Sequence, residues 1–348
     1  MNKTLMLLAS ISKFLLSDDD KKIIIDALDW TDFNALLPLL YRHKIHHLFL
    51  KHIIDLEIAD EIPYAIVNAI SMQHSYLQFK HNEYMSEVCI VSEGLDRRQI
   101  PYVLLKGIGL SNTLFCHNKN IFRDYNDIDF LVEKSNVKKV DEILQGLGYI
   151  QGGVNSKQQI IKSDRKTNIY YSLNTHQEQA YVKFSKYSRY SPYNRIYLDI
   201  NTTIFEGGKM LTPIPTTELM NHTQRRKDIW GNEFCVLEYT YEFLQLCYHF
   251  YKDTVYDIKK FYNENYCLIK FCDLREYILI HRNEIDWDEF ITIVNQHKLG
   301  EKIYYPISLV SYFYGDKVET MRIQHHPEKG AQNRALENRA FQNKKDAV

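Results

Sequence analysis

The segment 126–132 reads Asn-Asp-Ile-Asp-Phe-Leu-Val, so two carboxylates stand at the beginning of a strongly apolar run. Alternate side chains of a β-strand point to the same face. Asp127 and Asp129 therefore project together, while Ile128 and Phe130 face the opposite, apolar side. The unbroken apolar run predicts a strand that is buried in a sheet, and ligands gather at the ends of such strands in open α/β sheets.

Two adjacent carboxylates repel each other and favour a cation, and hard oxygen ligands suit magnesium. The alternative is an acidic pair on the solvent side of an edge strand. Asp199 is a third candidate because it lies within the strand-forming run 197–201, where an unpaired charge is costly. On a neighbouring strand it would complete a two-metal cluster of the kind used in phosphoryl transfer. On an exposed face it would have no such role.

A lysine and a glycine follow the apolar segment 102–105, which predicts a strand that ends at a turn before a helix. The backbone amides of Lys106 and Gly107, with the positive end of the following helix, fit a phosphate-binding turn. The chain has neither the G-x-x-x-x-G-K-[ST] phosphate loop nor a G-x-G-x-x-G fingerprint, which argues against P-loop and Rossmann folds.

Apolar periodicity divides the chain into helical and mixed stretches. We predict an N-terminal helical region (1–99), an α/β core (100–205), a C-terminal helical domain (206–318) and a polar, mobile tail (319–348). Strands are expected at 102–105, 127–132, 168–173, 180–184 and 196–200, and a helix after residue 137. The fold class is therefore α/β (α+β), with a mixed sheet flanked by helical regions.

The charge of the chain is nearly balanced, with 43 basic and 44 acidic residues. A polynucleotide partner is therefore not expected, because binding to phosphates requires a basic surface. The chain contains no run of 18 consecutive apolar residues, so no membrane-spanning helix is predicted. Six cysteines without a C-x-x-C pair favour a reduced, cytoplasmic protein.

Together these segments resemble a family of uncharacterised bacterial nucleotidyltransferases in the DNA polymerase β superfamily. The resemblance extends over about residues 30–300 and is carried by the runs 100–107, 123–132, 147–149, 197–200, 246–249 and 270–274. It implies a polymerase-β-like core and transfer of a nucleoside monophosphate from a triphosphate, with ATP expected, to a hydroxyl of a small molecule or protein, with release of pyrophosphate.

The resemblance also implies roles for individual residues. Asp127, Asp129 and Asp199 would be catalytic and would bind two Mg²⁺ or Mn²⁺ ions. Lys106 and Gly107 would hold the triphosphate, although related enzymes carry Gly-Ser at this turn and a shorter gap to the first aspartate. The acceptor is not predicted.

Other charged residues have two interpretations each. Arg123 is either a phosphate partner or part of a surface salt bridge. His249 and Asp273 are expected as a buried hydrogen-bonded pair or as substrate contacts. Arg225-Arg226-Lys227 is predicted to be a solvated turn, with contact to an acidic partner or a nucleotide phosphate as the alternative. His43, His46 and His47 have the spacing of a helical zinc site, although no Glu or Cys pattern accompanies them.

Two alternative functions remain open at this stage. One is a nucleotide-binding or partner-binding module that has the fold but no transfer activity. The other is an antitoxin-like transferase that modifies a protein.

Overall fold

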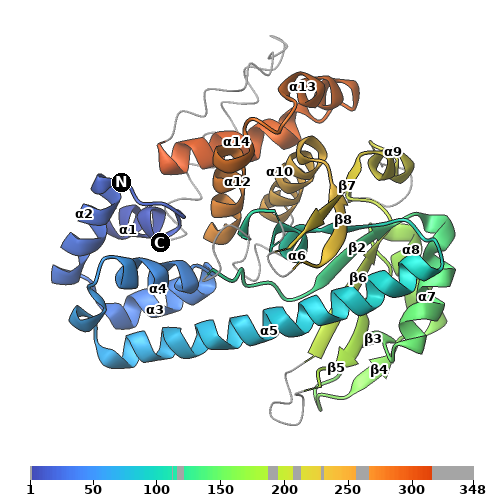
Figure 1. The fold of residues 1–348 in the computed structure, drawn as a ribbon, viewed down its shortest axis with the longest axis horizontal. Helices are drawn as coiled ribbons and strands as arrows, with labels where there is room; N and C mark the ends of the chain where they lie inside the picture. The colour runs from blue at the N-terminus through green and yellow to red at the C-terminus, as the bar shows by residue number, and fades with distance from the viewer. Residues whose placement is uncertain are drawn as a thin grey trace. The chain divides into compact units, whose positions relative to one another are not determined.

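The computed structural model describes residues 2–111, 113–115, 121–186, 195–206, 213–228, 231–255 and 266–315, which belong to the compact unit Met1–Asp316. The predicted tail 319–348 lies outside the described residues. A mixed sheet with the strand order β4-β3-β5-β6-β2-β1-β8-β7 forms the centre of this unit (Figure 1). Its strands are β1 (Tyr102–Leu105), β2 (Ile128–Val132), β3 (Ile150–Val154), β4 (Ile160–Lys162), β5 (Tyr181–Phe184), β6 (Arg195–Asn201), β7 (Thr223–Lys227) and β8 (Glu233–Leu237).

The central strands have one apolar face and one face that carries charge. β2 pairs with β6 in parallel and with β1 in antiparallel orientation. Alternation along β2 sends Ile128 and Phe130 into the main apolar core, together with Leu198 and Ile200 of β6. Helices α5 (Tyr64–Arg97) and α7 (Val137–Gly146) contribute the other side of this core. The residues between these apolar positions therefore face the opposite side of the sheet.

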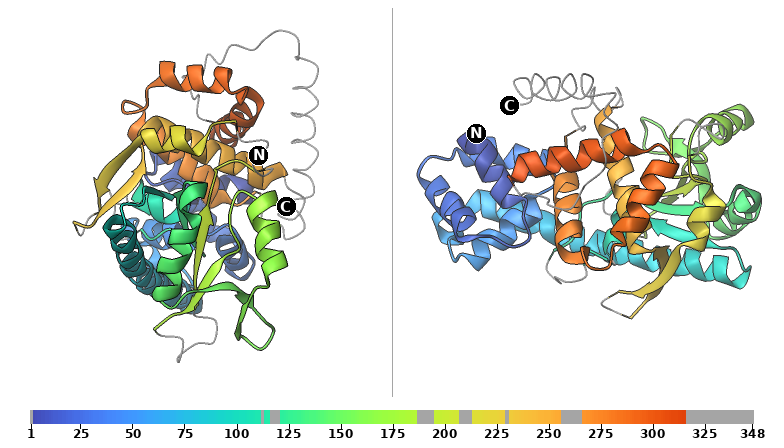
Figure 2. Two further views of the ribbon diagram at one scale, coloured as in Figure 1. Left: turned by 90° about the vertical axis from the view of Figure 1, so that its right-hand side faces the viewer. Right: turned by 90° about the horizontal axis from the view of Figure 1, so that it is seen from above.

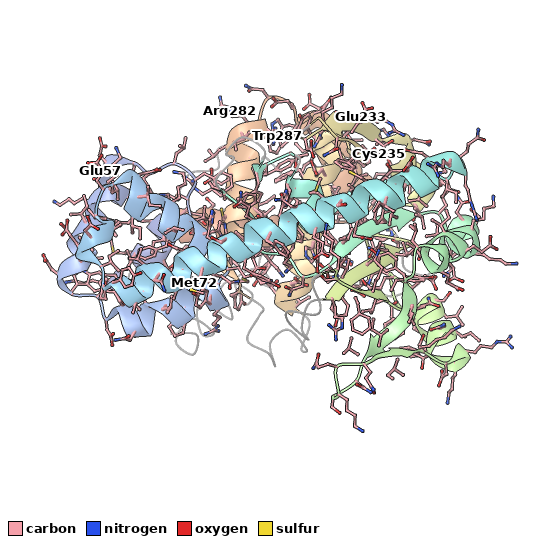
Figure 3. All side chains as sticks on the ribbon, turned by 60° about the horizontal axis from the view of Figure 1, so that its bottom comes forward. Glu57, Met72, Glu233, Cys235, Arg282 and Trp287 are labelled. Atoms are coloured by element: carbon pink, nitrogen blue, oxygen red, sulfur yellow. The ribbon has the colours of Figure 1, made fainter. Side chains whose placement is uncertain are left out.

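The N-terminal region is helical, as predicted. It consists of α1 (Lys3–Ile11), α2 (Asp18–Asp26), α3 (Phe33–Arg42), α4 (His46–Asp55) and the long helix α5. A capping box of Ser17 and Asp20 begins α2, and Pro63 precedes α5. The 34-residue α5, on which Met72 is labelled in Figure 3, runs from the other N-terminal helices to the sheet (Figures 1, 2 and 3).

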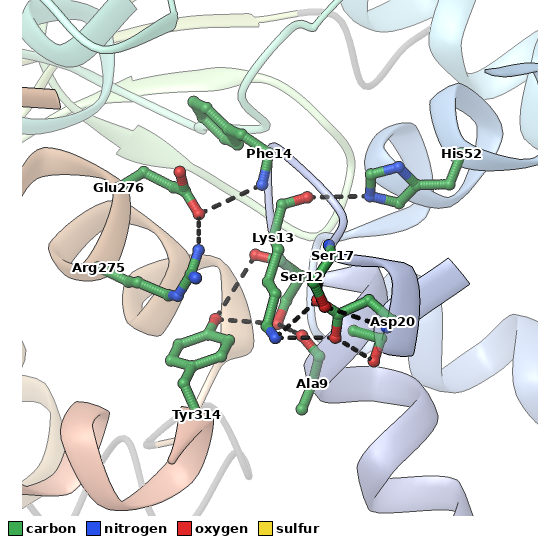
Figure 4. A network of polar contacts seen from close by, with 11 residues as sticks. Ala9, Ser12, Lys13, Phe14, Ser17, Asp20, His52, Arg275, Glu276 and Tyr314 are labelled. Carbon is green, nitrogen blue, oxygen red and sulfur yellow. Dashed lines mark hydrogen bonds and ion pairs between the residues drawn. The ribbon is translucent and has the colours of Figure 1, made fainter. Parts of the chain in front are cut away.

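The C-terminal helices pack on the sheet and on the N-terminal region. They are α10 (Tyr239–Val255), α12 (Leu268–His281), α13 (Trp287–Gln296) and α14 (Gly300–Tyr314). The helices between the strands are α6 (Lys106–Ser111), α8 (Arg165–Asn174) and α9 (Thr216–Asn221), besides α7. Figure 4 shows the polar contacts that join α12 and α14 to the turn after α1. The Phe14 backbone N–H donates to Glu276 at 3.2 Å, and the hydroxyls of Ser12 and Tyr314 are 2.9 Å apart.

Two local predictions were wrong. The segment 168–173 lies in helix α8, which Asp164 caps through the Thr167 N–H, and not in a strand. Its β-branched and aromatic residues suggested a strand, but none of its side chains is fully buried. The segment Arg225-Arg226-Lys227 lies in the edge strand β7, which pairs with β8, and not in a turn. One face of an edge strand can be polar, so apolar alternation did not reveal it.

None of the helices in the described ranges has an apolar stretch long enough to cross a membrane.

Several buried histidines occupy the N-terminal region. His46 is 1% and His47 0% exposed, and in the described ranges neither ring nitrogen of either residue has a hydrogen-bond partner. Burial lowers the pKa of His46 to about 4, and the same cause lowers the pKa of His43 and His52 to about 4. Within the described residues no three His, Cys, Asp or Glu side chains are grouped to hold a metal ion. The predicted spacing therefore does not produce a zinc site here.

These histidines predict that acid destabilises the fold. A histidine whose folded pKa is near 4 and whose unfolded pKa is about 6.5 stabilises the fold fully above pH 6.5 and loses that contribution as the pH falls toward 4. We expect His46→Phe to gain stability relative to wild type, by up to about 3 kcal/mol, between pH 7 and pH 4.5. Urea unfolding of both proteins across this range measures the difference.

The comparison with wild type isolates His46 from groups that titrate elsewhere in the molecule, because distant substitutions act additively. His222→Phe is the control, since His222 keeps 32% of its side chain exposed. An unchanged difference between His46→Phe and wild type from pH 7 to pH 4.5 would contradict the prediction.

Candidate active site

Parallel pairing of β2 with β6 brings the predicted carboxylates together. Asp129 and Asp199 are directly opposite each other in the register of the two strands, and Asp127 immediately precedes β2. Asp129 is 2% exposed. Because Ile128 and Phe130 face the α5–α7 core, Asp129 faces the other side of the sheet. The structure thus places all three predicted aspartates at one location.

Lys106 supplies a cation to this cluster. Its Nζ donates to Asp129 Oδ1 at 2.8 Å, and the side-chain amide of Asn201, on β6, donates to the same oxygen at 3.0 Å. Lys106 directly follows β1, and its φ is +48°, a left-handed conformation that non-glycine residues seldom adopt. The lysine is fixed where the antiparallel register pairs Leu105 with Asp129.

The three carboxylates differ in their affinity for protons. Burial, with repulsion from Asp129, raises the pKa of Asp127, and burial with repulsion from both neighbours raises the pKa of Asp199 to about 8. Burial acts in the same direction on Asp129, but the Lys106 ammonium and the Asn201 amide outweigh it and lower its pKa. One ammonium therefore pairs with one carboxylate, and among the described residues neither Asp127 nor Asp199 has an ion pair of its own.

Gly107 permits a close approach beside Lys106. A Cβ at this position would lie 2.8 Å from the Tyr125 Cβ and 2.9 Å from Arg123 Nη1. Both distances are shorter than real contacts allow, so any larger residue would displace the chain that precedes β2. Gly107, in the first turn of α6, thus packs against Tyr125 and Arg123, and its predicted role in holding a triphosphate stays a prediction.

Arg123 and Asp273 form a buried ion pair. Arg123 Nη2 and Nε donate to Asp273 Oδ2 at 2.8 and 3.0 Å, and the two side chains are only 9% and 4% exposed. Asp273, on α12, therefore pairs with Arg123 and not with His249, and the salt bridge of Arg123 is buried and not on the surface. These contacts join the segment before β2 to the C-terminal helices.

A pocket brings four of the predicted residues together. It is lined by Lys106, Leu110, Arg123, Leu246, His249, Phe250, Lys270, Asp273 and Leu274. His249 Nε2 lies 3.7 Å from Asp253 Oδ2, and its buried Nδ1 has no hydrogen-bond partner in the part of the chain that the structure describes. Lys270 also pairs with Asp253. The pocket thus connects the carboxylate cluster with α10 and α12 and is lined by three basic side chains.

Sequence reasoning missed the residues that the C-terminal helices add. Lys252, on α10, pairs with Glu206 at 3.1 Å, and Glu206 also contacts His176 at 2.9 Å. Burial and the nearby Lys106 lower the pKa of Lys252 to about 8, and burial lowers that of Lys270 to about 7. No sequence signal distinguished these lysines from others on amphipathic helices, because their positions depend on how α10 and α12 pack on the sheet.

Lys44 is a further missed cation, from the N-terminal region. It follows α3 with a φ of +56°, and its charge partly offsets the burial that raises the pKa of Asp127 and of Asp273. Among the described residues the Lys44 ammonium makes no hydrogen bond or ion pair, while its backbone N–H donates to the Tyr41 carbonyl at 3.1 Å. The N-terminal helices therefore contribute charge to the same site as the sheet and the C-terminal helices.

The chemistry of the donor set suits a divalent metal ion. Asp127, Asp129 and Asp199 offer only oxygen ligands, and their mutual repulsion is the condition that a bound cation relieves. In the described residues, however, three such side chains do not yet converge on one point. A shared ion would require the carboxylates to turn toward one another, and Asp129 to give up its contact with Lys106.

Comparison with known proteins identifies one similarity. A family model described as an uncharacterised nucleotidyltransferase matches residues 29–315, which is more than half of the chain. No curated protein and no solved structure matches.

Proposed function

This chain belongs to a family of uncharacterised nucleotidyltransferases, and on that premise we propose that it moves a nucleoside monophosphate from a nucleoside triphosphate to a hydroxyl of a small molecule or protein. The observation that carries the proposal is the pairing of Asp129 with Asp199 on parallel strands, with Asp127 and Lys106 beside them. Carboxylates on one side and buried cations on the other suit a triphosphate and its metal ions.

The aspartates of the cluster would bind the metal ions and accept a proton. Asp127, Asp129 and Asp199 would hold two magnesium or manganese ions, which would neutralise the carboxylates and polarise phosphate oxygens. Asp199, on the β6 edge of the cluster, would accept the proton of the attacking hydroxyl. The new bond joins the acceptor oxygen to the α-phosphorus, and the bond to the β-phosphate breaks, which releases pyrophosphate.

The basic side chains around the pocket beside the cluster would bind the rest of the triphosphate, and because the cavity volume is only about 10 Å³, the side chains that line it would have to move apart to admit the phosphates. Lys106 and Lys270 line it, and Gly107 allows the backbone to pack closely at the same turn. Arg123 would mainly hold the segment before β2 in position, because its guanidinium is already paired with the Asp273 carboxylate. ATP is the expected nucleotide, and the acceptor would contact the C-terminal helices near His249.

Binding of nucleotides tests the proposal most directly. Each of the four ribonucleoside triphosphates is added with magnesium or manganese, and thermal unfolding is followed. A ligand at a concentration of about 100 Kd would stabilise the fold by about 2.7 kcal/mol. Cell extract with the selected nucleotide is then searched by mass spectrometry for an adduct of nucleotide mass. Failure of every nucleotide to raise the melting temperature would refute the proposal.

A nucleotide-binding module without transfer activity is the second candidate. The Lys106–Asp129 contact favours it, because an internal ammonium already occupies one carboxylate of the cluster. Such a module would gain stability with a nucleotide but release no pyrophosphate with any acceptor. Pyrophosphate release by the wild-type protein would exclude it.

A further inference from the structure

We infer that Lys106 is the resting counter-ion of the carboxylate cluster, so that the site takes up a metal–triphosphate chelate as one unit and excludes a free divalent ion. This inference rests on the proposed function and specifies the form in which the substrate binds. The nucleotide and its metal would then enter together, each dependent on the other.

The contact at Asp129 is the first observation. One oxygen, Asp129 Oδ1, accepts both from the Lys106 ammonium at 2.8 Å and from the Asn201 amide at 3.0 Å. A divalent ion that shared this carboxylate would lie next to a positive charge in a buried location, where repulsion is strong. Lys106 must therefore leave Asp129 before an ion can use it.

The backbone of Lys106 is the second observation. A φ of +48° is inexpensive for glycine and unfavourable for lysine. A glycine at this junction of β1 and α6 would adopt the same φ without strain. The presence of a lysine there therefore indicates that its ammonium is needed at the site. Strained non-glycine residues of this kind concentrate at functional sites.

The pocket explains where the ammonium goes. Lys106 lines it together with Arg123 and Lys270, and these two cations have their own carboxylates in Asp273 and Asp253. The cavity has a volume of only about 10 Å³, so a triphosphate would have to push its lining side chains apart. Its phosphates would then offer Lys106 new anionic partners, and Asp129 would become available to the accompanying metal ion.

Neither component satisfies these charges alone. A free ion would leave the Lys106 ammonium without a partner in a buried place, which is costly. A metal-free triphosphate would add negative charge beside three carboxylates. Only the chelate supplies an anion for Lys106 and a cation for the aspartates.

Binding of Mn²⁺ without nucleotide tests the inference. Free Mn²⁺ is measured by electron paramagnetic resonance during titration of wild type, Lys106→Met and Lys106→Arg. We expect Lys106→Met to bind Mn²⁺ alone at least about tenfold more tightly than wild type, because the competing charge is gone. Lys106→Arg keeps that charge and should bind Mn²⁺ as weakly as wild type. Lys106→Gln is the second neutral variant if circular dichroism shows that Lys106→Met does not fold.

Lys13 provides a matched control. Its Nζ lies 2.8 Å from Asp20 Oδ1, and its side chain is 14% exposed against 16% for Lys106, but the pair lies in the N-terminal helices (Figure 4). Lys13→Met should therefore leave Mn²⁺ binding unchanged.

A second titration, with Mn²⁺ and α,β-methylene ATP, separates the two proposals. Wild type should bind this chelate, and Lys106→Met should bind it more weakly. If wild type binds the chelate but Lys106→Met binds free Mn²⁺ no more tightly than wild type, the counter-ion role is wrong while the proposed function stands. If wild type binds no chelate, the proposed function fails, and this inference with it.

Discussion

Replacing Asp273 with asparagine is expected to lower the free energy of unfolding by about 3 kcal/mol or more. The change leaves the Arg123 guanidinium buried, at 9% exposure, with a neutral amide in place of two carboxylate oxygens. A buried charge that loses its partner is costly, because water cannot replace the lost interaction. Urea unfolding at neutral pH, followed by circular dichroism, measures the loss.

An exposed pair of the same residue types is the control. Arg225 Nη2 lies 3.0 Å from Asp96 Oδ1, and the two side chains are 49% and 43% exposed. Asp96→Asn should cost less than about 1 kcal/mol, because solvent screens such pairs. Equal losses in Asp273→Asn and Asp96→Asn would mean that the buried pair is not a structural link between the sheet and α12.

The double variant Arg123→Met with Asp273→Leu gives an independent check. It removes both charges and so should recover part of the stability that Asp273→Asn loses. The recovery distinguishes the cost of an unpaired charge from the loss of packing around α12. A double variant less stable than Asp273→Asn would favour packing as the main contribution.

The central strands were predictable from the sequence because burial leaves a simple pattern in it. β1, β2 and β6 are short apolar runs, and they formed where the composition indicated. α8 was mispredicted since its Ile and Tyr residues favour strands locally, while the helix has no buried face to produce a helical period. β7 was missed for the opposite reason, because an edge strand rich in Arg and Lys lacks apolar alternation.

The acidic half of the site was also predictable, and the basic half was not. Asp127, Asp129 and Asp199 stand out because a charge within an apolar strand is unusual, and the pairing of β2 with β6 brings them together. Lys44 and Lys252 carry no such signal. Lys44 lies in the turn after α3 and Lys252 lies on α10, and only the packing of these segments against the sheet places the two lysines at the site.

The division between acidic strands and basic helices has a consequence for function. The sheet alone presents three carboxylates and one ammonium, which attracts cations. The lysines of α10 and α12 add positive charge on the opposite wall, but Glu206 and Asp253 offset it. The site therefore keeps the negative charge of its unpaired carboxylates, so a ligand that brings a metal ion together with phosphates fits it better than a bare anion.

Asp129→Asn is expected to abolish nucleotide transfer, with a loss of at least about a thousandfold in rate, and to remove metal-dependent nucleotide binding. Asp129 is the most buried of the three carboxylates, and it holds both Lys106 and Asn201 in place. Asparagine has nearly the same shape, so the sheet should persist, but the charge that a metal ion requires is lost. Asp127→Asn should behave similarly. Calorimetry with Mg²⁺ and the selected nucleotide measures binding, and pyrophosphate release measures transfer.

Asp20→Asn separates loss of the site from loss of a buried carboxylate. Asp20 is 4% exposed and also has a lysine Nζ at 2.8 Å, but it lies in the N-terminal helices. This variant should be less stable than wild type and yet bind nucleotide with unchanged affinity below its melting temperature. Unchanged Mg²⁺-dependent binding in both Asp127→Asn and Asp129→Asn would instead show that the carboxylate cluster is not the nucleotide site.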